Sequence, residues 1–476
     1  MSKWETVIGL EVHAELSTKS KIFCSCPAHF GGEPNTHVCP VCSGMPGTLP
    51  VLNKEVVEYA IKLGTVLNCN ITRNNKFDRK NYFYPDLPKA YQVSQLYAPI
   101  CQNGYVEIEV DGKTKSITIS EIHMEEDAGK LIHDTSGNTY TDYNRCGVPL
   151  LEIVTGADFS NEQEVVAYLE KLKETLLYLD ICDCKMQEGS LRADVNLSIR
   201  PIGGELGTRT EMKNLNSFKA IARAIEAERE RQIDLLEAGE KITQETRRWD
   251  DDRGVSYAMR SKENAQDYRY FPEPDLLPIY IDDSWLNSVK NSLPELAQEK
   301  RNRYENDFKL TNKESVILTS HKNISDLFEN LTKETNEPKE CANLVTGEIM
   351  RLLKSTNTIA DDLNVDHKKL SYVTSLVLAK KINRDVAKAV IEEVFVNNID
   401  PENYIKEKNL IIVEDTGAVE SIVSEIIASN PKVVDDFKAG KEKAIGFFMG
   451  QSMKKLQGRG NPDTVKAVII DQLSKL

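Results

Sequence analysis

The pattern of hydrophobic and polar positions near the N-terminus predicts a β-strand with one apolar and one polar face. From position 4 to position 16, one set of alternate residues is almost entirely apolar. A period of two places neighbouring residues on opposite faces of a strand, and the polar face here carries Glu11, His13 and Glu15. Two interpretations are open: an ordinary half-exposed strand, or one wall of a site that binds a hard cation.

Three later segments also place acidic side chains on predicted strands. A hairpin is predicted around Asp111-Gly112, and its second strand ends at Glu125 and Glu126. These two side chains point to opposite faces unless the strand is irregular there. Two further alternating segments gather charged residues on one face each, namely Arg192 and Asp194, then Arg209, Glu211 and Lys213. If these strands are neighbours in one antiparallel sheet, the acids could hold Mg²⁺ and the cations could hold a triphosphate.

Helical periodicity separates the strands and dominates the C-terminal part of the chain. A capping box at Ser160–Gln163 predicts a helix to about position 180, and Ser217 predicts the start of another that ends near Gly239. From about 294 the chain shows successive amphipathic helices without a strand signal, and a break at Asn397–Pro401 precedes a helical tail. The pattern therefore predicts an α+β protein with domains at 1–293, 294–407 and 408–476.

Composition places the chain among ordinary globular proteins. With 476 residues, of which 40% are hydrophobic and 28% charged, it has room for two or three domains with their own cores. The net charge of -14 argues against a surface coated in nucleic acid, but it permits a local basic patch. No apolar run approaches the roughly 20 residues that cross a bilayer, and the N-terminus lacks a signal-peptide pattern. We therefore expect a cytoplasmic protein without membrane contact.

Two close cysteine pairs follow the first predicted strand. They are Cys24 and Cys26, then Cys39 and Cys42, within a loop over 24–42. Four thiolates with this spacing can close a tetrahedron around a structural zinc ion, and a cytoplasmic setting disfavours disulfides. The alternative is a set of small buried residues.

A loop over 79–92 combines aromatic, proline and basic residues. Tyr82, Tyr84 and Lys89 would suit an anionic ligand with a flat ring, such as a nucleotide. A surface loop that packs its own tyrosines is an equally good interpretation. The chain contains no P-loop, Gly-x-Gly-x-x-Gly loop or His-Glu-x-x-His helix, so a nucleotide site is expected on a sheet.

The C-terminal tail contains a predicted glycine-rich basic turn at Gly450–Pro462. Its Lys454, Lys455 and Arg459 could contact a phosphate backbone. A solvated loop explains the same charges.

Several motifs, in matching order, resemble the GatB family, the B subunits of bacterial aspartyl/glutamyl-tRNA amidotransferases of the GatCAB type. The motifs are Ile8–His13, the two cysteine pairs, Asn81–Lys89, His123–Asp127, Arg192–Asn196 and Glu211–Ser217. The segment at Gly450–Pro462 is similar to the tRNA-contacting tail of that family. The resemblance extends over the whole chain.

The resemblance implies a fold and a reaction. The N-terminal domain would be a cradle similar to the catalytic sheet of glutamine synthetase, followed by an all-helical domain and a small helical tail domain. The protein would use ATP and Mg²⁺ to phosphorylate the side-chain carboxylate of Glu misacylated on tRNA(Gln), or of Asp misacylated on tRNA(Asn). Ammonia made from glutamine by the A subunit would displace the phosphate, and the C subunit would hold the other two together. The alternative is a non-catalytic tRNA-binding scaffold in the same complex.

The resemblance also implies roles for the residues named above. The catalytic and magnesium-binding set would be Glu11, His13, Glu125, Glu126 and Glu211, with Asp194 as a further candidate. The residues near the nucleotide or the ammonia exit would be Tyr82, Tyr84, Lys89, Arg192, Asp194 and Lys213. Cys24, Cys26, Cys39 and Cys42 match the zinc-bearing members, and Lys454, Lys455 and Arg459 would contact tRNA.

Overall fold

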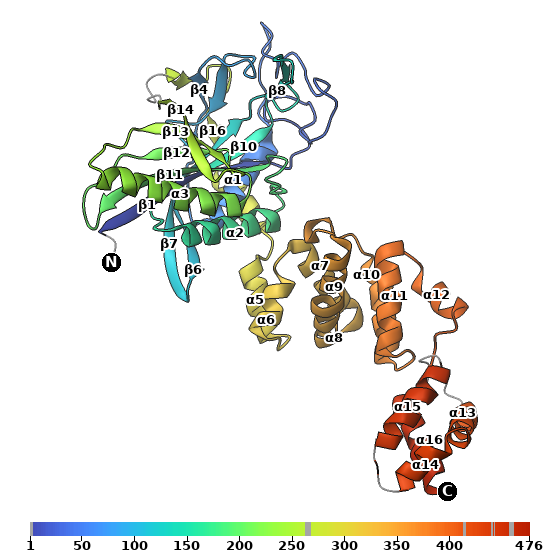
Figure 1. Cartoon of the computed structure of the whole chain (residues 1–476). Helices are drawn as coiled ribbons and strands as arrows, with labels where there is room; N and C mark the ends of the chain where they lie inside the picture. The colour runs from blue at the N-terminus through green and yellow to red at the C-terminus, as the bar shows by residue number, and fades with distance from the viewer. Residues whose placement is uncertain (1–2, 262–267, 413–415, 439–440, 442, 457–460) are drawn as a thin grey trace. The chain divides into compact units, whose positions relative to one another are not determined.

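The computed structural model forms two compact units, Met1–Leu296 and Ala297–Leu476 (Figure 1). It describes residues 3–261, 268–412, 416–438, 441, 443–456 and 461–476.

A nine-stranded sheet organises the first unit, and its first strand, β1, lies in the middle. The strand order is β14-β13-β12-β11-β1-β10-β7-β6-β2. The bounds are β1 (Trp4–Glu15), β2 (Asn70–Ile71), β6 (Cys101–Val110), β7 (Lys113–Glu126), β10 (Pro149–Thr155), β11 (Leu191–Pro201), β12 (Thr210–Lys213), β13 (Glu245–Asp250) and β14 (Val255–Ser261). Neighbouring strands are antiparallel except β12 and β13, which run parallel. With the helical second unit, this sheet confirms the predicted α+β class.

Helices cover the apolar face of the sheet. They are α1 (Lys54–Val66), α2 (Glu162–Tyr178) and α3 (Phe218–Glu237), and α4 (Asp283–Asn291) packs against α1. Figure 1 shows α2 and α3 lying along the sheet. Ile8, Leu10 and Val12 of β1 are buried in one core with residues of these helices, as the alternation predicts. The opposite face of β1 is therefore left for polar side chains.

The ends of the helices largely follow the predicted caps. Ser217 caps α3, where its hydroxyl accepts from the amide of Ala220 at 3.0 Å. The predicted cap at Ser160 is one residue early, because the side chain of Asn161 accepts from the amide of Glu164 at 2.9 Å. Asparagine and serine both cap well, so the sequence alone does not separate adjacent candidates.

Short strands outside the main sheet form three small sheets, one of which contains the segment 78–94. They are β3 (Asn74–Asn75), β4 (Asp78–Asn81), β5 (Tyr91–Ser94), β8 (Lys130–His133), β9 (Thr139–Asp142), β15 (Phe271–Pro272) and β16 (Ile279–Tyr280). The three small sheets are β15-β4-β5, β16-β3 and β8-β9. The pairing of β4 with β15 brings together segments about 190 residues apart in the sequence.

The second unit is helical throughout its described residues. Its α-helices are α5 (Ala297–Asn306), α6 (Asn312–Leu318), α7 (Lys322–Thr335), α8 (Pro338–Asn343), α9 (Met350–Thr356), α10 (His367–Leu378), α11 (Arg384–Asn397), α12 (Pro401–Glu407), α13 (Thr416–Ala428), α14 (Pro431–Lys438), α15 (Lys443–Lys455) and α16 (Pro462–Ser474), with a π-helix at Leu344–Ile349 and a 3₁₀ turn at Ala360–Asp362. Two hydrophobic cores form, one within 304–405 and one within 419–473. Among the described residues, no helix is long and apolar enough to cross a bilayer.

Candidate active site

The register of β1 with its two neighbours gathers acidic side chains on the polar face. Glu11 lies opposite Asp194 of β11, and His13 lies opposite Glu152 of β10. In the next pair, Glu152 lies opposite His123 of β7. Directly opposed residues in antiparallel strands point to the same face, so these side chains meet above the sheet as two clusters.

The first cluster joins two imidazoles and two carboxylates. Nε2 of His13 lies 3.4 Å from Glu152 and 3.7 Å from Glu125. Nε2 of His123 lies 2.8 Å from Glu152 and 3.7 Å from Glu125. One ligand atom from each of His13, Glu125 and Glu152 lies within 4.8 Å of the other two. Imidazole nitrogen and carboxylate oxygen in this arrangement could hold a divalent cation.

Charge coupling shifts the protonation of this cluster. Burial alone would lower the pKa of His13, but the charge of Glu152, with smaller contributions from Glu125 and Asp194, raises it. The pKa of His123 is raised well above its ordinary value for the same reason, again against the effect of burial. Burial would raise the pKa of Glu152, but the two imidazoles hold it well below the ordinary range. The two imidazoles therefore favour their protonated forms, whose charge offsets that of the carboxylates.

The second cluster consists of Glu11, Asp194 and Glu211, whose carboxylate oxygens also lie within 4.8 Å of one another. The ammonium of Lys213 forms an ion pair with Asp194 and lies 3.3 Å from Glu211. Three carboxylates this close repel one another, so the cluster needs such a cation, a metal ion, or both.

Neutral side chains orient two of these carboxylates. The amide of Asn196 donates to Glu11 at 2.9 Å, and the hydroxyl of Thr246 donates to Glu211 at 2.9 Å. Thr246 reaches Glu211 because the parallel pairing of β12 and β13 sets the two residues side by side. Within the described part of the chain, Oδ1 of Asn196 is buried without a hydrogen-bond partner, so a hard oxygen ligand remains beside the carboxylates.

Glu126 lies apart from both clusters. Its carboxylate pairs with Lys89 and accepts from the amide of Val93 at 2.9 Å. The pair borders a cavity of about 240 Å³ whose other walls include Cys24 and Cys42. The irregularity of β7 falls near Ile119 and not at its end, so Glu125 and Glu126 alternate as in a regular strand.

A third charged group surrounds the end of β1. Arg192 donates to Asp127 at 2.7 Å and lies 4.0 Å from Glu15, while Arg145 lies 3.4 Å from Asp127. Burial, and then the neighbouring carboxylate of Asp127, raises the pKa of Glu15 to about 8. Glu15 is therefore part of a buried network, not the surface residue that alternation alone permits.

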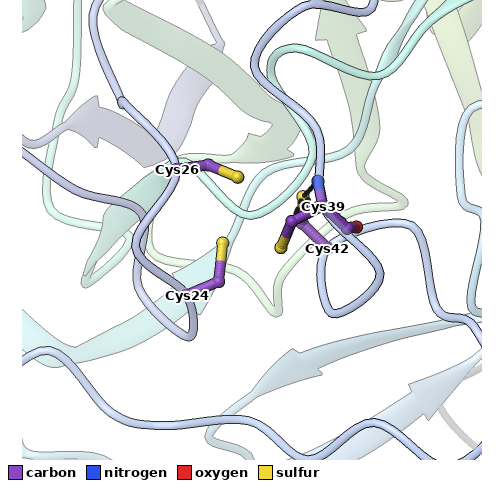
Figure 2. Close-up of side chains that lie close together, drawn as sticks. All are labelled: Cys24, Cys26, Cys39 and Cys42. Carbon is purple, nitrogen blue, oxygen red and sulfur yellow. Dashed lines mark hydrogen bonds between the residues drawn. The ribbon is translucent and has the colours of Figure 1, made fainter.

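The four cysteines of the 24–42 loop converge (Figure 2). Their sulfur atoms lie within 4.8 Å of one another, with 3.8 Å between those of Cys39 and Cys42. The pKa of the Cys42 thiol falls to about 4, because Cys24 donates to it and Lys21 lies nearby. Lys21 approaches that sulfur at 3.6 Å. Clustered sulfur with one thiolate already favoured is a donor set that could bind a soft or borderline metal ion.

The tyrosines of the 79–92 loop separate. Tyr84 exposes 55% of its surface. Tyr82 is half-buried, and its ring lies 5.9 Å from that of Tyr268. The structure thus brings Tyr82, and not Tyr84, into an aromatic group.

The basic segment of the tail is partly helical. Lys454 and Lys455 lie at the end of α15, so the predicted turn is wrong for 450–455. Lys455 pairs with Glu425. Arg459 lies outside the described residues.

Sequence reasoning missed Glu152 and His123 as site residues. His123 precedes Glu125 by two residues on β7, so the period of two would have placed both on one face. Glu152 is the single acid in the apolar strand Pro149–Thr155, and a lone charge in a buried strand is a signal worth following. Asn196 ends one of the family motifs but carried no predicted role, and Thr246 gave no signal, because the roles of both depend on strand pairing.

Comparisons with known proteins support the resemblance over the whole chain. The GatB/GatE catalytic domain matches residues 6–287, and the GatB domain matches residues 326–473. The aspartyl/glutamyl-tRNA(Asn/Gln) amidotransferase B subunit of Lachnoclostridium phytofermentans is 58% identical over 477 residues, covering 100% of both chains. The proteins of the same name from Lachnospira eligens and Caldicellulosiruptor bescii are 55% and 53% identical, covering 99% and 100% of this chain and 100% of each relative.

The raised pKa of Glu15 predicts a pH-dependent difference between the wild type and Glu15→Gln. The folded state holds the Glu15 proton between the ordinary pKa of 4.5 and about 8, so wild-type stability falls as pH rises through this window. Glutamine mimics the protonated acid and does not titrate. We therefore expect the free energy of unfolding of the variant, relative to that of the wild type, to rise by ~3 kcal/mol between pH 5 and 8.5.

Tryptophan fluorescence during urea unfolding measures this difference in the first unit, because Trp4, Trp249 and Trp285 all lie there. Glu107→Gln, at an exposed position on β6, is the matched control and should show no pH-dependent gain. A constant difference between wild type and Glu15→Gln across this pH range would contradict the prediction.

Proposed function

Since the chain belongs to the GatB family, we propose that it is the B subunit of an aspartyl/glutamyl-tRNA(Asn/Gln) amidotransferase, as its relatives are named. In this proposal it works with the amidase A subunit, the small C subunit and a misacylated tRNA. The enzyme is a ligase that forms a C–N bond with glutamine as the amido donor. The product is Gln-tRNA(Gln), Asn-tRNA(Asn) or both.

The observation that carries the proposal is the pair of acid clusters on β1. A carboxylate is a poor electrophile for ammonia, so it must first gain a leaving group. We infer that the substrate carboxylate attacks the γ-phosphorus of ATP, the bond to the ADP oxygen breaks, and an acyl phosphate forms. Ammonia then attacks the acyl carbon and phosphate leaves. Phosphoryl transfer of this kind needs positioned groups and compensated charge more than covalent chemistry from the protein.

The two clusters fit divalent cations. Glu11, Asp194 and Glu211 offer carboxylate oxygens beside the orphaned amide oxygen of Asn196, and His13, Glu125 and Glu152 offer a second set. Mg²⁺, when bound, neutralises phosphate oxygens and the substrate carboxylate, which otherwise repel each other. The protein fixes the ligands through the hydrogen bonds from Asn196 and Thr246.

The remaining predicted residues take supporting roles in the proposal. Lys213 lies between two carboxylates of the second cluster and could turn to a phosphate when a metal ion binds. Arg192 fixes the Asp127 carboxylate behind the site.

Ammonia could approach through the cavity beside Lys89 and Glu126, which is separate from the acid clusters. Tyr82, and Tyr84 on the exposed side of the same loop, would flank the nucleotide.

We also propose that the four cysteines hold a structural zinc ion. With four protein ligands the ion would have no open position for a water molecule, so its role would be to fix the loop over 24–42. That loop borders the cavity beside Lys89, so a fixed conformation of the loop would also fix the wall of this cavity.

The alternative, a non-catalytic tRNA-binding scaffold, needs no acid clusters. Two groups of three converging ligands on one sheet face would then impose repulsion without use. This cost favours the catalytic interpretation.

Replacement of Glu11 by alanine tests the catalytic proposal. In the reconstituted three-subunit complex, we expect the variant to lose at least ~100-fold in ATP hydrolysis stimulated by misacylated tRNA, because phosphate charge is no longer compensated. His13→Ala should behave alike. Binding of tRNA should be unchanged, and Glu109→Ala, on an exposed position of β6, should hydrolyse ATP normally. Full hydrolysis by both site variants would favour the scaffold.

Elemental analysis tests the zinc proposal. We expect one zinc ion per chain in the wild type and much less in Cys42→Ser, together with a lower melting temperature, since structural zinc contributes folding energy. Cys341→Ser, which changes a buried cysteine of the second unit, should keep its zinc. If the wild-type protein is fully folded but contains no zinc, the proposal is wrong and the four cysteines serve only in packing.

Charge reversal at the end of α15 tests the tRNA contact proposed for Lys454, Lys455 and Arg459. Lys454→Glu should weaken tRNA binding by the complex. It should also make the slope of log affinity against log salt concentration shallower by about one, the effect of losing one phosphate contact. Glutaminase activity should stay unchanged. Lys466→Glu, an exposed lysine on α16, is the control. Equal weakening by both variants, or by neither, would argue against a specific contact at Lys454.

A further inference from the structure

One cation of the active-site region differs from the others in its surroundings. Lys213 pairs with Asp194, Arg192 with Asp127, and Lys89 with Glu126. Lys80, on β4, has no carboxylate within ion-pair distance in the part of the chain that the structure describes. Its Nζ lies over two aromatic rings, 5.1 Å from the ring centre of Tyr268 and 5.9 Å from that of Tyr82.

The rings around Lys80 form an ordered group. Tyr82 and Tyr268 meet edge to face with 5.9 Å between ring centres, and Tyr268 meets Tyr270 in the same way at 6.2 Å. All three tyrosines are half-buried. Such geometry is favourable between rings, and ring faces attract an ammonium.

Contacts with β4 fix the segment that carries Tyr268 and Tyr270. The side-chain amide of Asn81 donates to the carbonyl of Arg269 at 2.8 Å. Directly after it, Phe271 pairs with Arg79 in the small sheet. These contacts hold Tyr268 and Tyr270 against β4. Since β4 also carries Lys80, the rings and the ammonium keep a fixed position relative to each other.

The neighbours of Lys80 favour its charged form. Burial would lower the pKa of Lys80, but the electrostatic effects of Tyr270 and then of the carboxylates of Glu125 and Glu152 outweigh burial and raise it. The side chain therefore stays an ammonium. Ring faces attract its charge but accept no conventional hydrogen bond, so its donors remain available for an anion that approaches the cluster.

We propose that Lys80 is a further catalytic residue, whose ammonium donates hydrogen bonds to the phosphoryl group during its transfer from ATP to the substrate carboxylate. This inference rests on the proposed function. The new bond joins the carboxylate oxygen to the γ-phosphorus, the bond to the ADP oxygen breaks, and its electron pair leaves with ADP. Lys80 keeps its proton throughout and stabilises charge on the equatorial oxygens. The tyrosine group is the positioning element, because it holds the cation without neutralising it.

Neutralising Lys80 tests the proposal. In the complete complex, Lys80→Met should lower the kcat of tRNA-stimulated ATP hydrolysis by ~100-fold, the typical loss when one charge-stabilising donor is removed, while tRNA binding and glutaminase activity stay unchanged. Lys80→Arg should recover part of this loss because it keeps the charge. Lys76→Met is the matched control, since Lys76 also lies over a tyrosine ring, that of Tyr97 at 5.9 Å, and it should keep full activity.

A binding measurement separates contact with the phosphoryl group from a structural role. The ratio of the affinities for AMP-PNP and ADP reports on the γ-position alone. We expect Lys80→Met to reduce this ratio by ~10-fold, as for the loss of one charged hydrogen bond, and Lys76→Met to leave it unchanged. Tyr268→Ala removes one ring face that holds the ammonium and should reduce both the ratio and kcat.

Three outcomes would overturn the proposal. One is full hydrolysis by Lys80→Met in a complex that Glu11→Ala inactivates, which leaves the proposed function standing. Another is a loss of activity with an unchanged AMP-PNP to ADP ratio and a lower melting temperature, which makes Lys80 structural. The last is full hydrolysis by both Lys80→Met and Glu11→Ala, which overturns the proposed function together with this inference.

Discussion

The pairing of β1 with β10 on one side and β11 on the other is the constraint on which the site depends. This register puts His13 opposite Glu152 and Glu11 opposite Asp194. A shift of one residue in either ladder would turn the matching acid into the core and an apolar side chain into the site. The hydrophobic contacts of Ile8, Leu10 and Val12 with the covering helices therefore also secure the chemistry on the opposite face.

Charge compensation is the second organising feature. Basic side chains balance the acids of the region: Glu152 lies against two imidazoles, Asp194 against Lys213, Glu126 against Lys89 and Asp127 against two arginines. Unpaired buried charges would cost far more than these pairs contribute. A site built this way can exchange protons or protein cations for metal ions and phosphates without a large change in net charge.

Elements far apart in the chain complete the site from outside the main strands. Thr246 reaches Glu211 through the one parallel pairing of the sheet. Tyr268 reaches the neighbourhood of Lys80 through the small sheet that joins β4 to β15. The cysteine loop borders the cavity beside Lys89. Each of these contacts positions a group that the acid clusters alone would leave unfixed.

The sequence by itself determined the features that depend on local geometry. Alternation assigned Glu11 and His13 to one face of β1, spacing paired the cysteines, and Ser217 marked the start of α3, because side-chain direction and caps are set by residues a few positions apart. Only the tertiary structure decided which strands are neighbours and in which register. That choice joined Glu152 and His123 to His13, paired Glu126 with Lys89, placed Glu15 beside Asp127, and brought the ring of Tyr268 over Lys80 from a distant segment. Such contacts arise from the packing of the whole apolar face, which no short stretch of sequence contains.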